Sequence, residues 1–303
     1  MSSNALAIAR PSLRRQPWRP LWTGSFRWAE TVWAIAFIAP YTAVFLAFVI
    51  YPVAYGMWMG SDPALYADLA ADPRFLNTVL NTLLFVGVGV NLKMFLAFLL
   101  SGFFISSASW RKALLVFFML PWALPALPAF LAWHWMLVGH WGFLNSLLAA
   151  LFGIEGPIWF SSYWLATGAN ITAYIWKWLP FWTLIFLAAR MAIPRDLFEA
   201  AEVDGATPVR RFAHVTVPLL ANLYLICTLL STAWTLGDFT TVYFVSSGAP
   251  ALSTEVLATL GMRDAFTIGN PALGVAAMMS ALPLLIPIVI TVMRKAQITR
   301  VQL

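Results

Sequence analysis

Charged residues are scarce in this sequence. Only 10% of its 303 residues are Asp, Glu, Lys or Arg, whereas soluble domains contain about 25%. Hydrophobic residues make up 61% of the chain, so the composition excludes both an ordinary soluble globular protein and a disordered one. There is one cysteine, Cys227, which excludes a disulfide framework and a cysteine-based metal site. These features together indicate a protein that resides in a membrane.

Several catalytic motifs are also missing. No Gly-x-x-x-x-Gly-Lys-Ser/Thr sequence occurs, so the chain is not expected to bind ATP by a P-loop, and we expect it to hold no cofactor. His-Glu-x-x-His and Gly-x-Ser-x-Gly are absent as well, and the long apolar segments contain almost no acidic residues. His134 and His140 have no carboxylate at metal-ligand spacing. The sequence therefore argues against an intramembrane enzyme.

What the sequence does contain is a series of long apolar segments. A helix needs roughly 20 apolar residues to cross the hydrocarbon core of a bilayer. We therefore predict an all-α, polytopic membrane protein with six spans, at about 32–59, 78–105, 113–138, 164–189, 215–236 and 271–293. Pro121, Pro125 and Pro128 are expected to bend the third span. The apolar piece 141–151 is too short to cross and is expected to be a surface or re-entrant segment.

The distribution of Lys and Arg predicts the orientation of these spans. Arg74 and Arg263 are the only ones expected on one side of the membrane, and Lys93 and Lys177 lie within spans. All other Lys and Arg residues fall on the opposite side, which is therefore predicted to be cytoplasmic, with both termini. Residues 1–30 are expected to form a basic and aromatic tail on the anionic inner surface, and residues 31–303 the transmembrane domain. The net charge of +6 is thus explained by the basic residues that mark the cytoplasmic side of the membrane. No nucleic-acid partner is expected.

The connection at 190–214, between spans four and five, is unlike the other loops. It holds four basic and four acidic residues in a charge-poor chain. Pro194 suits the first turn of a helix, and Gly205 suits the cap that ends one. Thr207 followed by Pro208 suits the start of a second helix. The pattern favours two short helices that form a docking surface facing the cytosol. A merely solvated connecting loop is the alternative.

This stretch resembles the EAA loop of binding-protein-dependent ABC importers, and we call residues 190–214 the coupling loop. The family pattern is Glu-Ala-Ala, three residues, Gly, nine residues and Ile-x-Leu-Pro, with two Val replacements in this chain. The matching residues here are Glu199, Ala200, Ala201, Gly205, Val215, Val217 and Pro218. The sugar-permease branch is resembled at Asn81-Thr82-Leu83, Ile175-Trp176-Lys177, Asp204-Gly205-Ala206 and 237–250. In the last of these, Gly237, Ser247 and Ala249 depart from the branch pattern.

The resemblance implies a type I ABC importer permease fold and the function that goes with it. The chain would be a multi-pass protein of the bacterial inner membrane and not itself an enzyme. With a second homologous permease it would form the path for a sugar or related polyhydroxylated solute. Two cytosolic ABC ATPase subunits would carry ATP and Mg, and an extracytoplasmic solute-binding protein would deliver the solute. The residues implied in coupling to the ATPase are Glu199, Ala200, Ala201, Asp204, Gly205 and Pro218.

Residues on spans three and four are candidates for the substrate path. Lys177 lies in a span, where charge is costly and often functional. Its alternative role is to bond a carbonyl freed by Pro180 or an acid on the partner subunit. Trp133, Trp176 and Trp178 could stack on sugar faces, although belts and helix packing also use tryptophan.

Two further charged residues have open roles. Asp238, at the outer end of span five, is a path candidate or an ordinary loop acid. Lys93, nearer the inner end of its span, is expected to snorkel. The alternative function for the whole chain is a stand-alone secondary carrier or channel for a small solute. Coupled carriers usually place acidic residues within spans and show repeated halves, and this sequence has neither feature.

Overall fold

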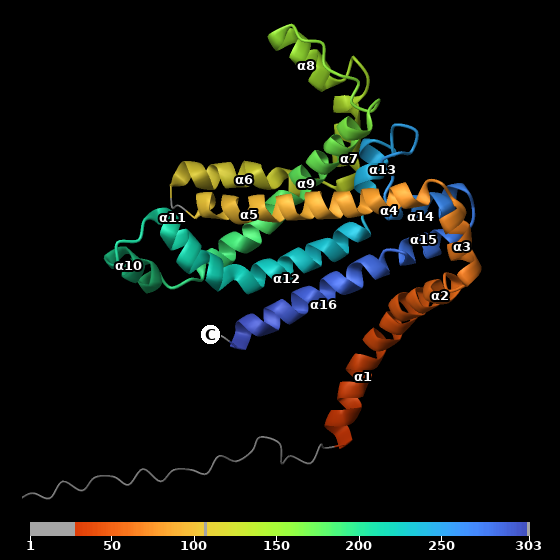
Figure 1. Cartoon of the computed structure of the whole chain (residues 1–303). Helices are drawn as coiled ribbons and strands as arrows, with labels where there is room; N and C mark the ends of the chain where they lie inside the picture. The colour runs from red at the N-terminus through yellow and green to blue at the C-terminus, as the bar shows by residue number, and fades with distance from the viewer. Residues whose placement is uncertain (1–27, 106–107, 302–303) are drawn as a thin grey trace, which may run out of the picture. The chain divides into compact units, whose positions relative to one another are not determined.

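The computed structural model describes residues 28–105 and 108–301, so most of the tail expected at 1–30 lies outside the described residues. All regular secondary structure in this described part is helical, which confirms the predicted all-α class (Figure 1). The elements are α1 (Trp28–Phe45), η1 (Leu46–Ile50), α2 (Tyr51–Met59), α3 (Pro63–Ala71), α4 (Phe75–Leu84), η2 (Phe85–Val90), α5 (Asn91–Phe104), α6 (Ser109–Ala123), α7 (Ala126–Leu137), α8 (Phe143–Phe152), α9 (Tyr163–Met191), α10 (Arg195–Val203), α11 (Pro208–Arg211), η3 (Phe212–Thr216), α12 (Val217–Leu236), α13 (Thr240–Val245), α14 (Leu257–Met262), η4 (Arg263–Thr267), α15 (Pro271–Met279) and α16 (Leu282–Val301).

Of the described residues, those up to Ala54 belong to one compact unit and those from Tyr55 onward belong to a second. In the first unit, α1 and the π-helical segment η1 lead directly into the beginning of α2. Every residue from Val32 to Ala54 is exposed, although most of them are hydrophobic. Such an all-round apolar surface suits contact with lipid or with another apolar surface rather than with water.

The long apolar helices agree with the predicted spans. Within the part of the chain that the structure describes, five of them are long and apolar enough to cross a membrane: Thr31–Met59, Phe75–Phe104, Tyr163–Met191, Pro208–Leu236 and Pro271–Thr291. The helix of the fifth span begins earlier than the predicted 215, because α11, η3 and α12 follow one another without a break. The apolar segment predicted to be too short to cross forms α8, a helix of 10 residues.

The third predicted span, 113–138, is two helices rather than one. The axes of α6 and α7 are bent by 95° relative to each other. Leu124 and Pro125 between them are extended, with ψ of 145° and 142°. Proline has no N–H and disfavours helical geometry in the residue before it, so Pro125 ends α6. The bend expected from the prolines is therefore confirmed, and the single span is corrected to a broken pair.

Lys177 of α9 bonds to the backbone at this break. Its ammonium group donates to the carbonyl oxygens of Pro121 at 2.8 Å and Trp122 at 3.3 Å, and also to that of Leu124. The lysine is buried, with 2% of its surface exposed. The carbonyl groups that it satisfies belong to the end of α6, and not to the turn before Pro180 in its own helix. This corrects the sequence-based alternative for Lys177.

The main core lies where α5, α9 and α12 pack together. Helix α5 packs against α9, which crosses it obliquely (Figure 1). The ring of Phe98 on α5 lies edge-on to Phe186 on α9, with centroids 5.4 Å apart. Phe186 in turn stacks on Tyr224 of α12 at 5.7 Å. Because each of the three helices contributes to one continuous aromatic cluster, the cluster holds them in a fixed register.

Two glycines let α14 and α15 approach closely. A Cβ atom placed on Gly274 would lie 2.5 Å from the carbonyl oxygen of Gly261 and 2.7 Å from the Cβ of Ala265. Both distances are far below van der Waals contact, and one of them involves backbone that cannot rotate away. Any side chain at residue 274 therefore forces the two helices apart.

Gly274→Ala is expected to destabilise the protein by about 1–3 kcal/mol, because it overpacks this contact. Thermal unfolding of the purified chain in detergent, followed by tryptophan fluorescence, would measure the change. Gly168→Ala is the matched control: residue 168 lies in helix α9, and a Cβ there meets nothing within 4 Å. We expect this control to keep or raise the melting temperature, since alanine favours helix. Equal losses in both variants would contradict the close-packing explanation.

Candidate functional site

A cavity of about 190 Å³ lies among α5, α9 and α12. We call it the Lys93 cavity. Its walls combine aromatic rings with hydroxyl groups and two charged side chains, which is the mixture expected of a small-molecule site. The lining residues are Lys93, Tyr174, Trp178, Trp182, Ser231, Trp234, Thr235 and Asp238.

Lys93 is buried in this cavity, with 2% of its surface exposed. Its ammonium group donates to the hydroxyl of Tyr174 and, at 2.7 Å, to the hydroxyl of Ser231. The same nitrogen lies 4.2 Å from the centroid of the Tyr174 ring and 5.7 Å from that of Trp182. The expectation that Lys93 snorkels towards the membrane surface is therefore wrong. The side chain instead turns inward because neighbouring helices offer it hydroxyl acceptors and aromatic faces.

The other cavity residues follow helical spacing, which is a signal that the sequence reasoning missed. Tyr174, Trp178 and Trp182 are four residues apart on α9 and therefore share one face of that helix. Ser231 and Thr235 are four apart on α12 for the same reason. The hydroxyl groups of Tyr174 and Thr235 lie 2.5 Å apart, which joins the two faces. A search for aromatic or hydroxyl-bearing residues at this spacing on neighbouring spans would have found both walls.

Asp238 lines the same cavity, but its carboxylate is already bonded within its own segment. One oxygen accepts from the hydroxyl of Thr240 at 2.6 Å and from the backbone N–H of Thr241 at 3.2 Å. The other accepts from the hydroxyl of Thr241 at 2.5 Å. The negative charge of Asp238 is thus stabilised by three donors at the start of α13, and it forms no direct ion pair with Lys93.

The five path candidates from the sequence occupy two different places. Trp178 and Asp238 line the Lys93 cavity. Trp133 and Trp176 pack against each other, with ring centroids 5.8 Å apart, and are not among the lining residues. Lys177 bonds to the broken span, as described above, and it does not line the cavity either. The structure therefore brings together two of the five.

The coupling loop contains the two short helices that its proline, glycine and threonine residues predict. Helix α10 ends at Val203, and Gly205, two residues further on, has φ of +75°. The N–H of Gly205 donates to the carbonyl of Glu202 at 3.0 Å, and that of Ala206 to Ala201 at 2.9 Å. This is the bonding pattern of a glycine-capped helix end. The hydroxyl of Thr207 then accepts from the N–H of Arg210 at 3.4 Å and caps α11.

The surface of the coupling loop is exposed and partly apolar. Glu199 and Ala200 are exposed on α10, Val203 is 88% exposed, and Val209 on α11 is 75% exposed. An ion pair between Arg211 and Glu202, with 3.0 Å between the charged atoms, links the two helical pieces. They border a hollow of about 490 Å³, lined by Ala201, Asp204, Ala206, Arg210, Arg211, His214 and Val215. Exposed apolar residues beside charged ones are typical of a docking surface.

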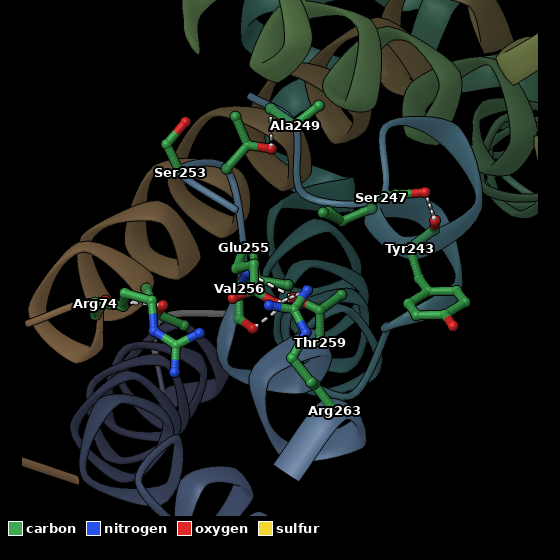
Figure 2. A network of polar contacts seen from close by, with 12 residues as sticks. Arg74, Tyr243, Ser247, Ala249, Ser253, Glu255, Val256, Thr259 and Arg263 are labelled. Carbon is green, nitrogen blue, oxygen red and sulfur yellow. Dashed lines mark hydrogen bonds and ion pairs between the residues drawn. The ribbon is translucent and has the colours of Figure 1, made fainter. Parts of the chain in front are cut away.

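A buried polar network lies near α4 and α14, at the end of the second unit that is away from the coupling loop (Figure 1). Glu255 is fully buried and forms an ion pair with Arg263, with 2.5 Å between the charged atoms (Figure 2). Burial raises the pKa of the Glu255 carboxyl, and the positive charge of Arg263 opposes this shift. Burial likewise raises the pKa of Asp264. Asn81 on α4 donates to the carbonyl oxygens of Ser253 and Glu255, both at 2.7 Å. The network fastens the turn before α14 to α4.

His134 bonds to the backbone of a helix that is distant in the sequence. The Nδ1 atom of His134 lies 2.8 Å from the carbonyl oxygen of Val245, and its ring stacks on Phe160 with centroids 5.4 Å apart. Within residues 28–105 and 108–301, no group of three or more His, Cys, Asp or Glu residues is placed to hold a metal ion.

The fold, the Lys93 cavity and the coupling loop together define a class of protein, that of helical membrane proteins with several spans. Comparison with known proteins narrows the class. Residues 72–301 match the family model described as the binding-protein-dependent transport system inner membrane component. The chain belongs to this family and is a permease subunit of an ABC importer, which confirms the resemblance found at the coupling loop.

Individual relatives agree with the family assignment. The chain is 33% identical over 263 residues to the sulfoquinovosyl glycerol transport system permease protein SmoG of Agrobacterium fabrum, covering 79% of this chain and 82% of that protein. It is 28% identical over 271 residues to the trehalose/maltose transport system permease protein MalF of Thermococcus litoralis, covering 84% and 90%. A crystal structure of a bacterial ABC transporter that imports the acidic polysaccharide alginate matches with a TM-score of 0.75 at 20% identity, covering 89% of this chain and 96% of that one. This last likeness concerns the fold.

Proposed function

We propose that this chain forms, with a second homologous permease, the path by which an ATP-driven importer carries a sugar or related polyhydroxylated solute across the bacterial inner membrane. The lining of the Lys93 cavity is the observation that supports a sugar as the solute. Tryptophan faces pack against the C–H faces of sugars, and hydroxyl groups bond to sugar hydroxyls. The solutes named for the relatives, sulfoquinovosyl glycerol and trehalose or maltose, support this proposal.

Within this function, Trp178 and Asp238 are the path residues from the sequence that also line the cavity. Lys177 holds the broken span beside the path, and Trp133 and Trp176 pack the helices that flank it. The chain itself needs no cofactor, because ATP and Mg would be bound by the ATPase subunits. An extracytoplasmic solute-binding protein would deliver the solute. A complex of a transporter of similar fold with a pentasaccharide-bound periplasmic protein supports this partner.

The coupling loop is the proposed contact with the two cytosolic ATPase subunits. Glu199, Ala200 and Ala201 lie along α10, and Asp204 and Gly205 end it. Small alanines permit close approach, and an exposed carboxylate can bond to a basic side chain of the partner. Pro218 lies in the first turn of α12, where it begins the regular part of the span. Closure of the ATPase dimer on ATP would move this loop and switch the path between inward and outward access.

Gentle affinity purification of the chain from its native membrane tests this function. We expect a second permease of similar size and a P-loop ATPase to be recovered in stoichiometric amounts. Vesicles containing the recovered complex should then take up solute only when ATP and the solute-binding protein are present. Recovery of the chain alone, active in vesicles without ATP, would instead establish a stand-alone carrier or channel.

Glu199→Lys is expected to lower the amount of ATPase recovered with the chain at least tenfold. The substitution places a positive charge where a basic partner residue is expected, and losing one buried partner of a charge pair costs about 2–5 kcal/mol. Glu155→Lys is the matched control, because Glu155 is also exposed but lies outside the coupling loop. Unchanged recovery of ATPase with the Glu199 variant would argue against this contact.

A further inference from the structure

The positive charge of Lys93 has no paired carboxylate in the part of the chain that the structure describes. Among the ion pairs there, none includes Lys93. Its two hydrogen-bond acceptors, the hydroxyls of Tyr174 and Ser231, are both neutral. The carboxylate of Asp238 shares the cavity and attracts the ammonium electrostatically, but it forms no ion pair with Lys93, and its oxygens bond to Thr240 and Thr241. A buried ammonium without a directly paired carboxylate is costly, and functional sites are where such costs are retained.

The ammonium group also has bonding capacity left. A lysine ammonium carries three N–H donors, and the hydroxyls of Tyr174 and Ser231 account for two of them. The third is available to the cavity that Lys93 lines. Around it stand the rings of Trp178, Trp182 and Trp234. The cavity therefore offers a cationic donor and aromatic walls to the same small molecule.

We propose that the transported solute is a sugar bearing an oxyanion, such as a carboxylate or a sulfate, and that the Nζ atom of Lys93 binds this group. The proposal rests on the proposed function and names the substrate class of the same cavity. An oxyanion supplies a directly bonded counter-charge and accepts the remaining N–H. The tryptophan rings pack against the sugar ring, and the hydroxyls of Ser231 and Thr235 bond to its hydroxyls.

A purely structural role for Lys93 is the competing explanation. The residue joins three helices, because Lys93 is on α5, Tyr174 on α9 and Ser231 on α12. A structural role predicts that substitution lowers stability and affects all solutes alike. A binding role predicts a change in the preference between charged and neutral solutes. Selectivity is therefore the readout that separates the two explanations.

The test measures equilibrium binding of small probes to the permease complex, which is recovered from the membrane and placed in lipid nanodiscs. The solute-binding protein is left out because it has a selectivity of its own. The probes are methyl β-D-glucuronide and methyl β-D-glucoside, which differ by a carboxylate in place of a hydroxymethyl group. Calorimetry measures both affinities. We expect about tenfold tighter binding of the glucuronide, the effect of one hydrogen bond to a charged group. Glucose 6-sulfate against glucose provides a second oxyanion.

Variants assign the preference to Lys93. Lys93→Met is expected to bring the ratio of the two affinities close to one, whereas Lys93→Arg should keep the preference because it retains the charge. Lys112→Met is the matched control, since Lys112 is exposed at the beginning of α6. The ratio in this control should equal that of the unmodified chain. The comparison of probes on the unmodified complex stands even where a Lys93 variant fails to fold.

Equal binding of the charged and neutral probes by the unmodified complex would overturn the proposal, as would a preference that survives in Lys93→Met. Failure of the proposed function has a different signature, which is the absence of ATPase subunits and of ATP-dependent uptake. An importer that takes up neutral sugars with ATP, but shows no preference for an oxyanion, would overturn only the inference about Lys93.

Discussion

Replacing Gly205 with proline is expected to abolish ATP-driven uptake while leaving the amount of chain in the membrane unchanged. Gly205 has φ of +75° at the end of α10, and proline is confined to φ of about −65°. The substitution also removes the N–H that donates to the carbonyl of Glu202. The direction in which the chain leaves α10 must therefore change, and with it the angle between the two halves of the coupling loop. The residue lies outside the candidate spanning helices of the described chain.

The glycine at the end of α8 provides a matched control. Gly153 has φ of +65° and donates its N–H to the carbonyl of Ala149 at 3.0 Å. A Cβ atom on Gly153 would meet nothing within 4 Å, and the same is true of Gly205. Gly153→Pro should thus impose a similar local strain outside the coupling loop. Membrane level, recovery of ATPase and uptake into vesicles would be measured for both variants. Normal uptake by Gly205→Pro would show that the geometry of this loop is not needed for coupling.

Replacing Lys177 with methionine is expected to cause the largest loss of stability of any single substitution considered. The lysine donates to the carbonyl oxygens of Pro121, Trp122 and Leu124 at the break between α6 and α7. Each buried acceptor that loses its donor costs about 1–3 kcal/mol. Methionine has nearly the same length but no donor, so we expect a loss of about 3 kcal/mol or more. Thermal unfolding in detergent, followed by tryptophan fluorescence, would measure it.

The control for this substitution is again Lys112→Met, because it removes the same charge from an exposed position. We expect its melting temperature to remain close to that of the unmodified chain. Lys177→Arg retains several donors and should lose less stability than Lys177→Met. A methionine variant as stable as the control would mean that other groups satisfy these carbonyls, and that the bend does not depend on Lys177.

The sequence predicts well those features that depend on neighbouring residues in the chain. Uninterrupted apolar length indicates the spans, and the caps at Gly205 and Thr207 follow from residue type alone. The angle of the bend at Leu124–Pro125 could not be predicted, since prolines indicate where a helix is interrupted but not by how much its direction changes. The carbonyl groups at this bend accept hydrogen bonds from Lys177, which is more than fifty positions away in the sequence.

The candidate site was harder to predict, because it depends on the register between helices. Lys93, Tyr174 and Ser231 meet only after α5, α9 and α12 have packed, and nothing near Lys93 in the sequence distinguishes a buried lysine from one that snorkels. The same reason separates Trp176 from Trp178: the two lie on different faces of one helix, and only the second reaches the cavity. Residue type alone suggests which side chains could bind a solute, but the neighbouring helix that each side chain meets determines its role.

The unbroken helix from Pro208 to Leu236 has a mechanical consequence. Its first turns carry exposed Val209 on the coupling loop, and its far part carries Ser231 and Thr235 in the cavity wall. At 1.5 Å per residue, the two regions are about 33 Å apart on a single rod. A tilt of about 5° at one end would shift the other by about 3 Å, roughly the length of a hydrogen bond. The helix can thus act as a lever arm, so that a push at the exposed start of the helix would shift the wall of the Lys93 cavity.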